Sequence, residues 1–115
     1  MKRDKNSNTI LRGKAASGGC TSGAVRIVYS NKDEKNFNNG NILVTKMTDP
    51  SMIKIMFKAA AIVTDVGGVT SHAAIIAREL GIPCVVATAK ATTILKNGMK
   101  IEVDGDQGIV LNVKT

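Results

Sequence analysis

A short apolar run, a glycine pair and an amphipathic helix follow one another in the middle of this 115-residue chain. Residues 60–64 are typical of a fully buried strand, and Gly67-Gly68 provides a turn. A helix is predicted from about Ser71 to Leu80, with Gly81 as a left-handed C-terminal cap. Its apolar face repeats at i, i+3, i+4 and i+7 and comprises Ala73, Ile76, Ala77 and Leu80. This strand–glycine turn–helix unit favours a layered α/β domain.

The flanking segments predict further strands around this central unit. We expect strands at 10–16, 23–29, 42–45, 84–87, 99–103 and 109–111, the last two forming a terminal hairpin. A polar loop is predicted over 31–41. A helix starts at Thr48-Asp49-Pro50, capped by Thr48 or Asp49, and carries an apolar stripe of Met52, Ile53, Met56 and Phe57. The sequence therefore predicts a mixed sheet in one domain, residues 10–115, preceded by a flexible lead over residues 1–9.

Composition narrows the class of protein further. Apolar residues make up 43% of the chain but aromatic residues only 3%, so the core must be aliphatic. Cys84 lies within an apolar run far from Cys20, which favours a reduced core thiol over a disulfide. No apolar run is long enough to cross a membrane, and the N-terminus lacks the apolar region of a signal peptide. We therefore expect a cytoplasmic protein without a membrane partner.

The net charge of +7 is confined to the first half of the chain. Residues 1–58 carry 11 basic and 4 acidic side chains, whereas residues 59–115 carry five of each. The lysines are scattered among Asn and Asp, without interleaved aromatic residues for base stacking. We interpret the excess as a solvated surface and do not expect a nucleic-acid partner.

The single histidine, His72, lies in the first turn of the predicted central helix. The positive end of a helix disfavours an imidazolium cation and stabilises an attached dianion, so the position suits a nucleophile that accepts a phosphoryl group. Gly67 and Gly68 allow close backbone approach to a phosphate, and Thr70 and Ser71 can cap the helix and donate to phosphate oxygens. With no second histidine and no cysteine nearby, we expect no metal here.

The acidic residues are weaker candidates for a functional site than His72. Asp65 precedes the glycines and either shapes the turn or tunes the histidine. Asp104 and Asp106 are interpreted as turn residues rather than metal ligands. The chain contains no Walker-type loop and no acidic pair arranged for magnesium, so it cannot be expected to activate ATP alone.

The run from Gly67 to Pro83, GGVTSHAAIIARELGIP, resembles the phosphohistidine signature of the PEP-utilising enzymes, a group that includes phosphoenolpyruvate synthase and pyruvate phosphate dikinase. Supporting similarity extends from Gly18-Gly19 through Thr48-Asp49-Pro50 to the segment 103–108. The resemblance covers roughly residues 10–112. It implies the mobile, swivelling β/β/α domain of that family, in which the histidine is phosphorylated at one active site and discharged at another.

The resemblance also implies roles and partners. His72 matches the phosphorylated histidine, reacting through the ring nitrogen far from the backbone, and Thr70 matches a threonine that is a regulatory phosphorylation site in the dikinase branch. The partners implied are an ATP-grasp nucleotide-binding domain and a PEP/pyruvate-binding barrel, in cis or in trans, which would hold ATP and Mg²⁺. We expect a phosphoryl-carrier part of a phosphotransferase. A non-catalytic regulatory or interaction module of the same fold, as appended to some pyruvate kinases, is the alternative.

Overall fold

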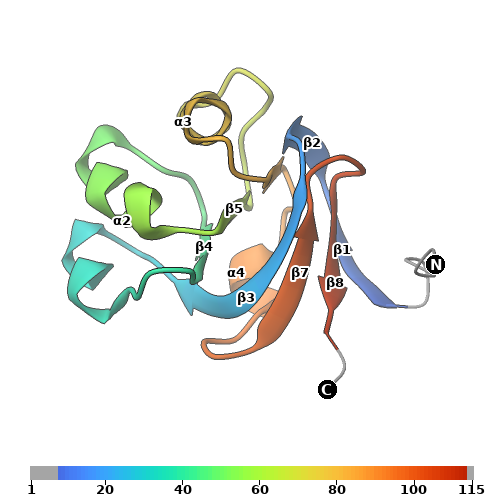
Figure 1. Cartoon of the computed structure of the whole chain (residues 1–115), viewed down its shortest axis with the longest axis horizontal. Helices are drawn as coiled ribbons and strands as arrows, with labels where there is room; N and C mark the ends of the chain where they lie inside the picture. The colour runs from blue at the N-terminus through green and yellow to red at the C-terminus, as the bar shows by residue number, and fades with distance from the viewer. Residues whose placement is uncertain (1–7, 114–115) are drawn as a thin grey trace.

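The computed structural model describes residues 8–113, which form a layered α/β domain (Figure 1). Its strands are β1 (Thr9–Arg12), β2 (Lys14–Ser17), β3 (Cys20–Ile27), β4 (Ile42–Thr45), β5 (Ala61–Thr64), β6 (Cys84–Val86), β7 (Lys100–Asp104) and β8 (Ile109–Asn112). Its helical elements are the 3-10 turns η1 (Asn31–Asn36) and η2 (Pro50–Met52) and the helices α2 (Ile53–Lys58), α3 (His72–Leu80) and α4 (Ala91–Ile94). Residues 1–7 of the predicted N-terminal lead lie outside the described residues, and Thr9 is the first residue of β1.

The strands form a mixed sheet in the order β1-β8-β7-β3-β4-β5-β6-β2. The four central strands β3, β4, β5 and β6 are parallel, as the connecting helices require. The long strand β3 changes partner along its length: Cys20–Ala24 pair antiparallel with β7, and Val25–Ile27 pair parallel with β4. The mixed sheet predicted from the sequence is confirmed.

The one strand predicted over residues 10–16 is two strands, because Gly13 interrupts it. β1 pairs with β8 at one end of the sheet order, and β2 pairs with β6 at the other. A Cβ atom at Gly13 would lie 2.3 Å from the carbonyl oxygen of Val86, so only glycine allows this close approach. Since the two outermost strands are consecutive in the chain, Gly13 joins the two ends of the strand order.

Two apolar clusters lie on opposite faces of the parallel strands. Leu43 and Ile62 face α2 and α3, whereas Ile42 and Val63 face α4 and the antiparallel strands β7 and β8. Because both faces are covered, β4 and β5 are apolar at nearly every position, as expected for strands buried on both sides. The domain therefore has two sheet layers and one helix layer, the β/β/α arrangement that the resemblance implied.

Two local predictions are corrected by the structure. Phe57 is one of the residues of the predicted apolar stripe, but it is 65% exposed, and Ile55, which was not in the stripe, is buried. The predicted stripe assumed one continuous α-helix from Pro50. The 3-10 turn η2 has fewer residues per turn, so the residues after it point in different directions from those of a continuous α-helix. The predicted loop 31–41 contains η1, which starts with a capping box between Ser30 and Asp33.

Among the described residues, the longest helix is α3 with nine residues, and none could cross a bilayer.

Candidate functional site

The helix α3 begins where the glycine turn after β5 ends. Ser71 is its N-cap: the hydroxyl accepts a hydrogen bond from the N–H of Ala74 at 3.4 Å and donates to the carbonyl of Gly68 at 2.7 Å. Gly67 has φ +116°, and a Cβ atom there would lie 3.2 Å from the Ser71 side chain. The turn therefore requires glycine at position 67 so that Ser71 can close over it and start the helix.

The far end of α3 is fixed as the sequence predicted. Gly81 adopts the left-handed conformation with φ +73° and donates to the carbonyls of Ala77 and Arg78. Ala73 and Ala77 are buried, while Ile76 and Leu80 are partly buried against the same apolar cluster. The predicted apolar face of the helix is confirmed, and it fixes the first turn of α3 against the sheet.

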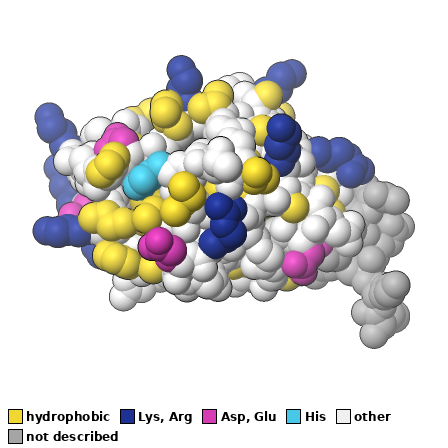
Figure 2. Space-filling view, turned by 90° about the horizontal axis from the view of Figure 1, so that it is seen from above, with side chains coloured by type: hydrophobic (Ala, Val, Ile, Leu, Met, Phe, Trp, Pro, Cys, Tyr) yellow, Lys and Arg dark blue, Asp and Glu magenta, His cyan; other side chains and the backbone are white. Residues whose placement is uncertain are grey.

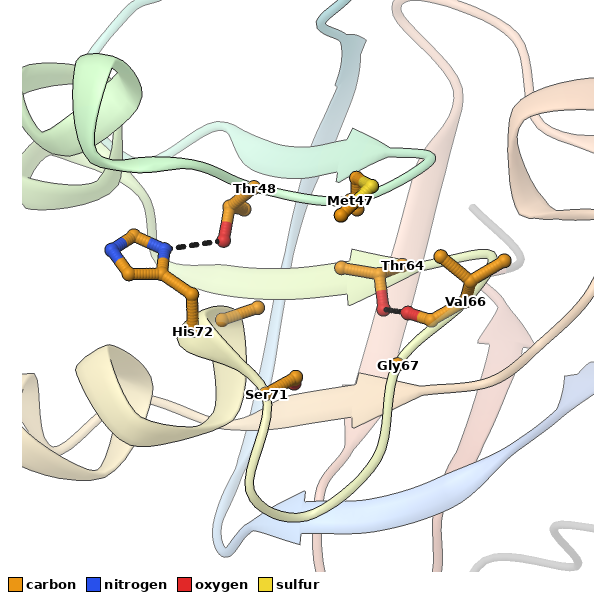
Figure 3. A pocket seen from close by; sticks show the side chains of 8 residues that line it. Met47, Thr48, Thr64, Val66, Gly67, Ser71 and His72 are labelled. Carbon is orange, nitrogen blue, oxygen red and sulfur yellow. Dashed lines mark hydrogen bonds between the residues drawn. The ribbon is translucent and has the colours of Figure 1, made fainter.

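His72 is the first residue of α3, and its ring is held by a residue from another strand connection. Thr48, which follows β4, places Oγ1 2.8 Å from Nδ1 of His72 (Figure 3). Thr48 is only 5% exposed, whereas His72 is half-buried. Figure 3 shows Nε2 on the side of the ring opposite Thr48. Among the described residues, no hydrogen bond occupies Nε2, which leaves this nitrogen for chemistry.

The contact of Thr48 with His72 could not be expected from the sequence, which offered Thr48 only as a helix cap. The cap of η2 is Asp49, whose carboxylate accepts from the N–H of Ser51 at 2.8 Å. Thr48 is thereby left to contact His72. The pairing of the strands explains this contact. β4 and β5 are parallel neighbours, so the segments that follow them, which carry Thr48 and His72, meet at the same edge of the sheet.

Asp49 contributes a negative charge close to this histidine. Hydrogen bonds from the hydroxyl and the backbone N–H of Ser51 hold the pKa of the Asp49 carboxyl below its usual range, and the positive charge of a protonated His72 acts in the same direction. Asp49 is therefore an anion at neutral pH.

The four residues predicted to support phosphate binding lie together in the turn before His72. Thr70 is exposed, and Gly68 has open space where a Cβ atom would stand. The Ser71 hydroxyl, by contrast, makes hydrogen bonds within the turn. Phosphate binding by Gly67, Gly68, Thr70 and Ser71 and regulatory phosphorylation of Thr70 stay predictions.

The acidic residues considered from the sequence have structural partners. Asp65 binds Thr92, accepting from its N–H at 3.0 Å and from its hydroxyl at 2.5 Å, so its carboxylate anchors the start of α4. Among the described residues, no hydrogen bond links it to His72. Asp104 accepts from the N–H groups of Asp106 and Gln107 and so shapes the β7–β8 turn.

The thiol of Cys20 lies near that turn. One ligand atom each from Cys20, Asp104 and Asp106 fall within 4.8 Å of one another, but Asp104 and Asp106 already accept backbone hydrogen bonds from the surrounding loops. Both aspartates therefore have the structural role in turns that the sequence predicted.

A cavity of about 220 Å³ adjoins the histidine (Figure 3). It opens between the segment after β4 and the glycine turn after β5. It is lined by Met47, Thr48, Thr64, Val66, Gly67, Ser71, His72 and Ala73. Figure 2 shows His72 in cyan among exposed hydrophobic side chains on this face of the molecule. The arrangement presents a half-buried imidazole at the surface, with one ring nitrogen held and an apolar hollow beside it.

Comparison with known proteins agrees with this fold and shows the family. Residues 37–108 match the family model "PEP-utilising enzyme, mobile domain", and this segment contains both Thr48 and His72. The chain belongs to this family. It is 54% identical over 101 residues to the phosphoenolpyruvate synthase of Pyrococcus furiosus, a match that covers 88% of this chain but only 12% of that protein. The chain thus spans about one eighth of the length of such relatives.

Solved structures show the same fold. The solution structure of an Enzyme I protein superposes with a TM-score of 0.57 at 39% identity, covering 64% of this chain and 30% of that chain. The aconitase X of Thermococcus kodakaraensis superposes with a TM-score of 0.66 and covers 90% of this chain and 98% of that chain. At 21% identity, this second likeness concerns the fold alone.

Proposed function

We propose that this domain is a phosphoryl carrier: His72 accepts a phosphoryl group at one active site and delivers it at another. The observation that supports this most directly is the hydrogen bond between Thr48 Oγ1 and His72 Nδ1. It fixes the half-buried ring at one nitrogen and leaves the other, on the opposite side of the ring, without a hydrogen bond among the described residues. A histidine that served only to cap or pack would need no such arrangement.

The chemistry follows from this arrangement. When Nδ1 carries the proton, its N–H donates a hydrogen bond to Thr48 Oγ1, and the lone pair of Nε2 is the nucleophile. Nε2 forms a bond to phosphorus, the phosphorus–oxygen bond of the donor breaks, and the leaving oxygen keeps the electron pair. The Nδ1 proton remains on the ring, so the phosphorylated imidazole is cationic and ready to lose the phosphoryl group to an acceptor. The reverse of the same step discharges the carrier.

The partners are proposed from the family resemblance. An ATP-grasp domain would supply the phosphoryl group from ATP with Mg²⁺, and a PEP/pyruvate barrel or another acceptor domain would receive it, within one chain or between chains. The much greater length of the related phosphoenolpyruvate synthases supports the presence of such partners. Their names support phosphoenolpyruvate chemistry, and the final acceptor is left open.

The test is transfer of label to the histidine. The protein is incubated with ³²P-phosphoenolpyruvate or ³²P-ATP and with the Pyrococcus furiosus phosphoenolpyruvate synthase whose own carrier histidine is replaced by alanine. We expect an acid-labile, base-stable phosphate on the wild-type domain and none on His72→Ala. Equal labelling of His72→Ala would contradict the proposal. If neither phosphoenolpyruvate nor ATP labels the wild-type domain, the result would favour the non-catalytic interaction module instead.

A further inference from the structure

The cavity beside His72 is apolar although it adjoins a group proposed to carry a phosphate. Each hydroxyl that lines it already has a partner within the protein. Thr64 Oγ1 donates to the carbonyl of Val66 at 2.6 Å, and the Ser71 hydroxyl donates to that of Gly68. Thr48 bonds to His72. The lining described above contains no Lys, Arg, Asp or Glu. The cavity therefore offers little to a phosphate or another polar ligand.

Exposed aliphatic side chains line this cavity and occur in the segments next to it. Met47 is 57% exposed and Val66 41%, and these two residues stand on opposite segments of the cavity wall (Figure 3). Val69 in the glycine turn and Ile75, one turn beyond His72, are also exposed. Figure 2 shows hydrophobic side chains gathered around the histidine. Apolar surface concentrated around a reactive group marks a contact surface rather than a solvated one.

We propose that the cavity receives one apolar side chain from the domain that phosphorylates His72. This inference rests on the carrier function proposed above. Transfer requires the donor phosphorus to approach Nε2 to about 3 Å, so the donor domain must contact the rim around the histidine. The cavity volume suits a single aliphatic or aromatic side chain, the kind of anchor that dominates many protein interfaces. Because no Lys, Arg, Asp or Glu lines the cavity and its hydroxyls already have partners, the anchor that it fits best is an apolar side chain.

The experiment replaces aliphatic side chains at the cavity mouth by neutral amides of similar size. Val66→Asn and Met47→Gln place an amide where the partner would bury it, and they add no charge that could act on the phosphoryl group. The matched control is Ile94→Asn, because Ile94 is 42% exposed and lies on α4, which packs against the opposite face of the sheet. Circular dichroism establishes that each variant is folded.

Two phosphoryl donors separate docking from chemistry. The first is the histidine-deficient Pyrococcus furiosus synthase, charged with labelled phosphoenolpyruvate or ATP. This protein must dock on the carrier domain before it can transfer the phosphoryl group. The second is phosphoramidate, a small donor that needs no docking. We expect Val66→Asn and Met47→Gln to lower the synthase-dependent rate, by about tenfold in the double variant. We expect the phosphoramidate rate to stay within about twofold of wild type, and Ile94→Asn to match wild type with both donors.

Several results would overturn the inference. One is an unchanged synthase-dependent rate in the folded double variant. A second is a shift of the Val66 methyl resonances on adding inorganic phosphate, which would assign the cavity to a polar ligand. A third is a wild-type dimer that Val66→Asn dissociates, which would assign it to a second copy of the chain. If wild type takes label from phosphoramidate but from no synthase donor, the carrier function fails and this inference fails with it.

Discussion

Thr48 and His72 are 24 residues apart in the chain, yet Oγ1 of the threonine lies 2.8 Å from Nδ1 of the histidine. Their contact joins the segments that follow two neighbouring parallel strands, β4 and β5. Because Thr48 is buried and has its side-chain oxygen on the imidazole, it positions the ring rather than reacting itself. The bond selects which ring nitrogen is presented to a donor.

Removing the hydroxyl at position 48 should therefore change the reactivity and tautomer of His72 without changing the fold. In Thr48→Val, Nδ1 loses its partner, and we expect phosphorylation of His72 to slow by about tenfold, the effect of losing one hydrogen bond to a group that becomes charged. Thr48→Ser keeps the oxygen and should retain most of the rate. The ¹⁵N NMR shifts of the ring give a direct readout, since the balance of the two neutral tautomers should change in Thr48→Val. Unchanged ring shifts in that variant would argue against a positioning role.

The start of α3 depends on Ser71 rather than on the neighbouring Thr70. Ser71→Ala removes the acceptor of the Ala74 N–H and the donor to the Gly68 carbonyl. We expect the free energy of unfolding to fall by about 1 kcal/mol, as for the loss of an N-cap. Thr70→Ala, at an exposed position, should change it by less than about 0.5 kcal/mol. Urea denaturation of the two variants checks this, and equal effects would contradict the assignment of the cap.

Much of this fold could be predicted because its strands and helices have clear local patterns. The run Ala61–Thr64, the apolar face of α3 and its Gly81 cap were all predictable from the sequence. The change of partner along β3 could not be predicted, because strand pairing depends on residues far apart in the chain. The break at Gly13 is similar: its cause is the carbonyl of Val86, which only the folded chain brings near.

The candidate site divides in the same way. His72 could be located from its place after a glycine turn, whereas Thr48 could not, since its role depends on the register of β4 against β5. The sequence predicted Ser71 both as a helix cap and as a donor to phosphate; the cap is confirmed, and phosphate binding stays a prediction. The apolar cavity arises from two loops meeting, and no pattern in either loop indicates it.

The two glycines before the histidine should differ in their tolerance of a side chain. Gly67 has φ +116° and lies against Ser71, so Gly67→Ala should lower the free energy of unfolding by about 1–2 kcal/mol. Gly68 is not among the residues with positive φ, and a Cβ atom there meets open space, so Gly68→Ala should be close to neutral. Urea denaturation measures both. Similar losses in the two variants would show that the turn requires glycine for another reason.

The two cysteines should differ sharply in reactivity. Burial raises the pKa of the Cys84 thiol to about 12, although Arg78 acts in the opposite direction, while Cys20 is exposed. Since the thiolate is the reactive form, a rise from 9.0 to about 12 lowers its fraction at pH 8 by about a thousandfold, and burial also blocks access. A thiol-specific chromogenic reagent should therefore titrate one thiol per native chain at pH 8 and two in denaturant. Cys20→Ser should titrate none until it is unfolded. Rapid reaction of Cys84 in native Cys20→Ser would show that α3 opens from the sheet far more readily than its packing implies.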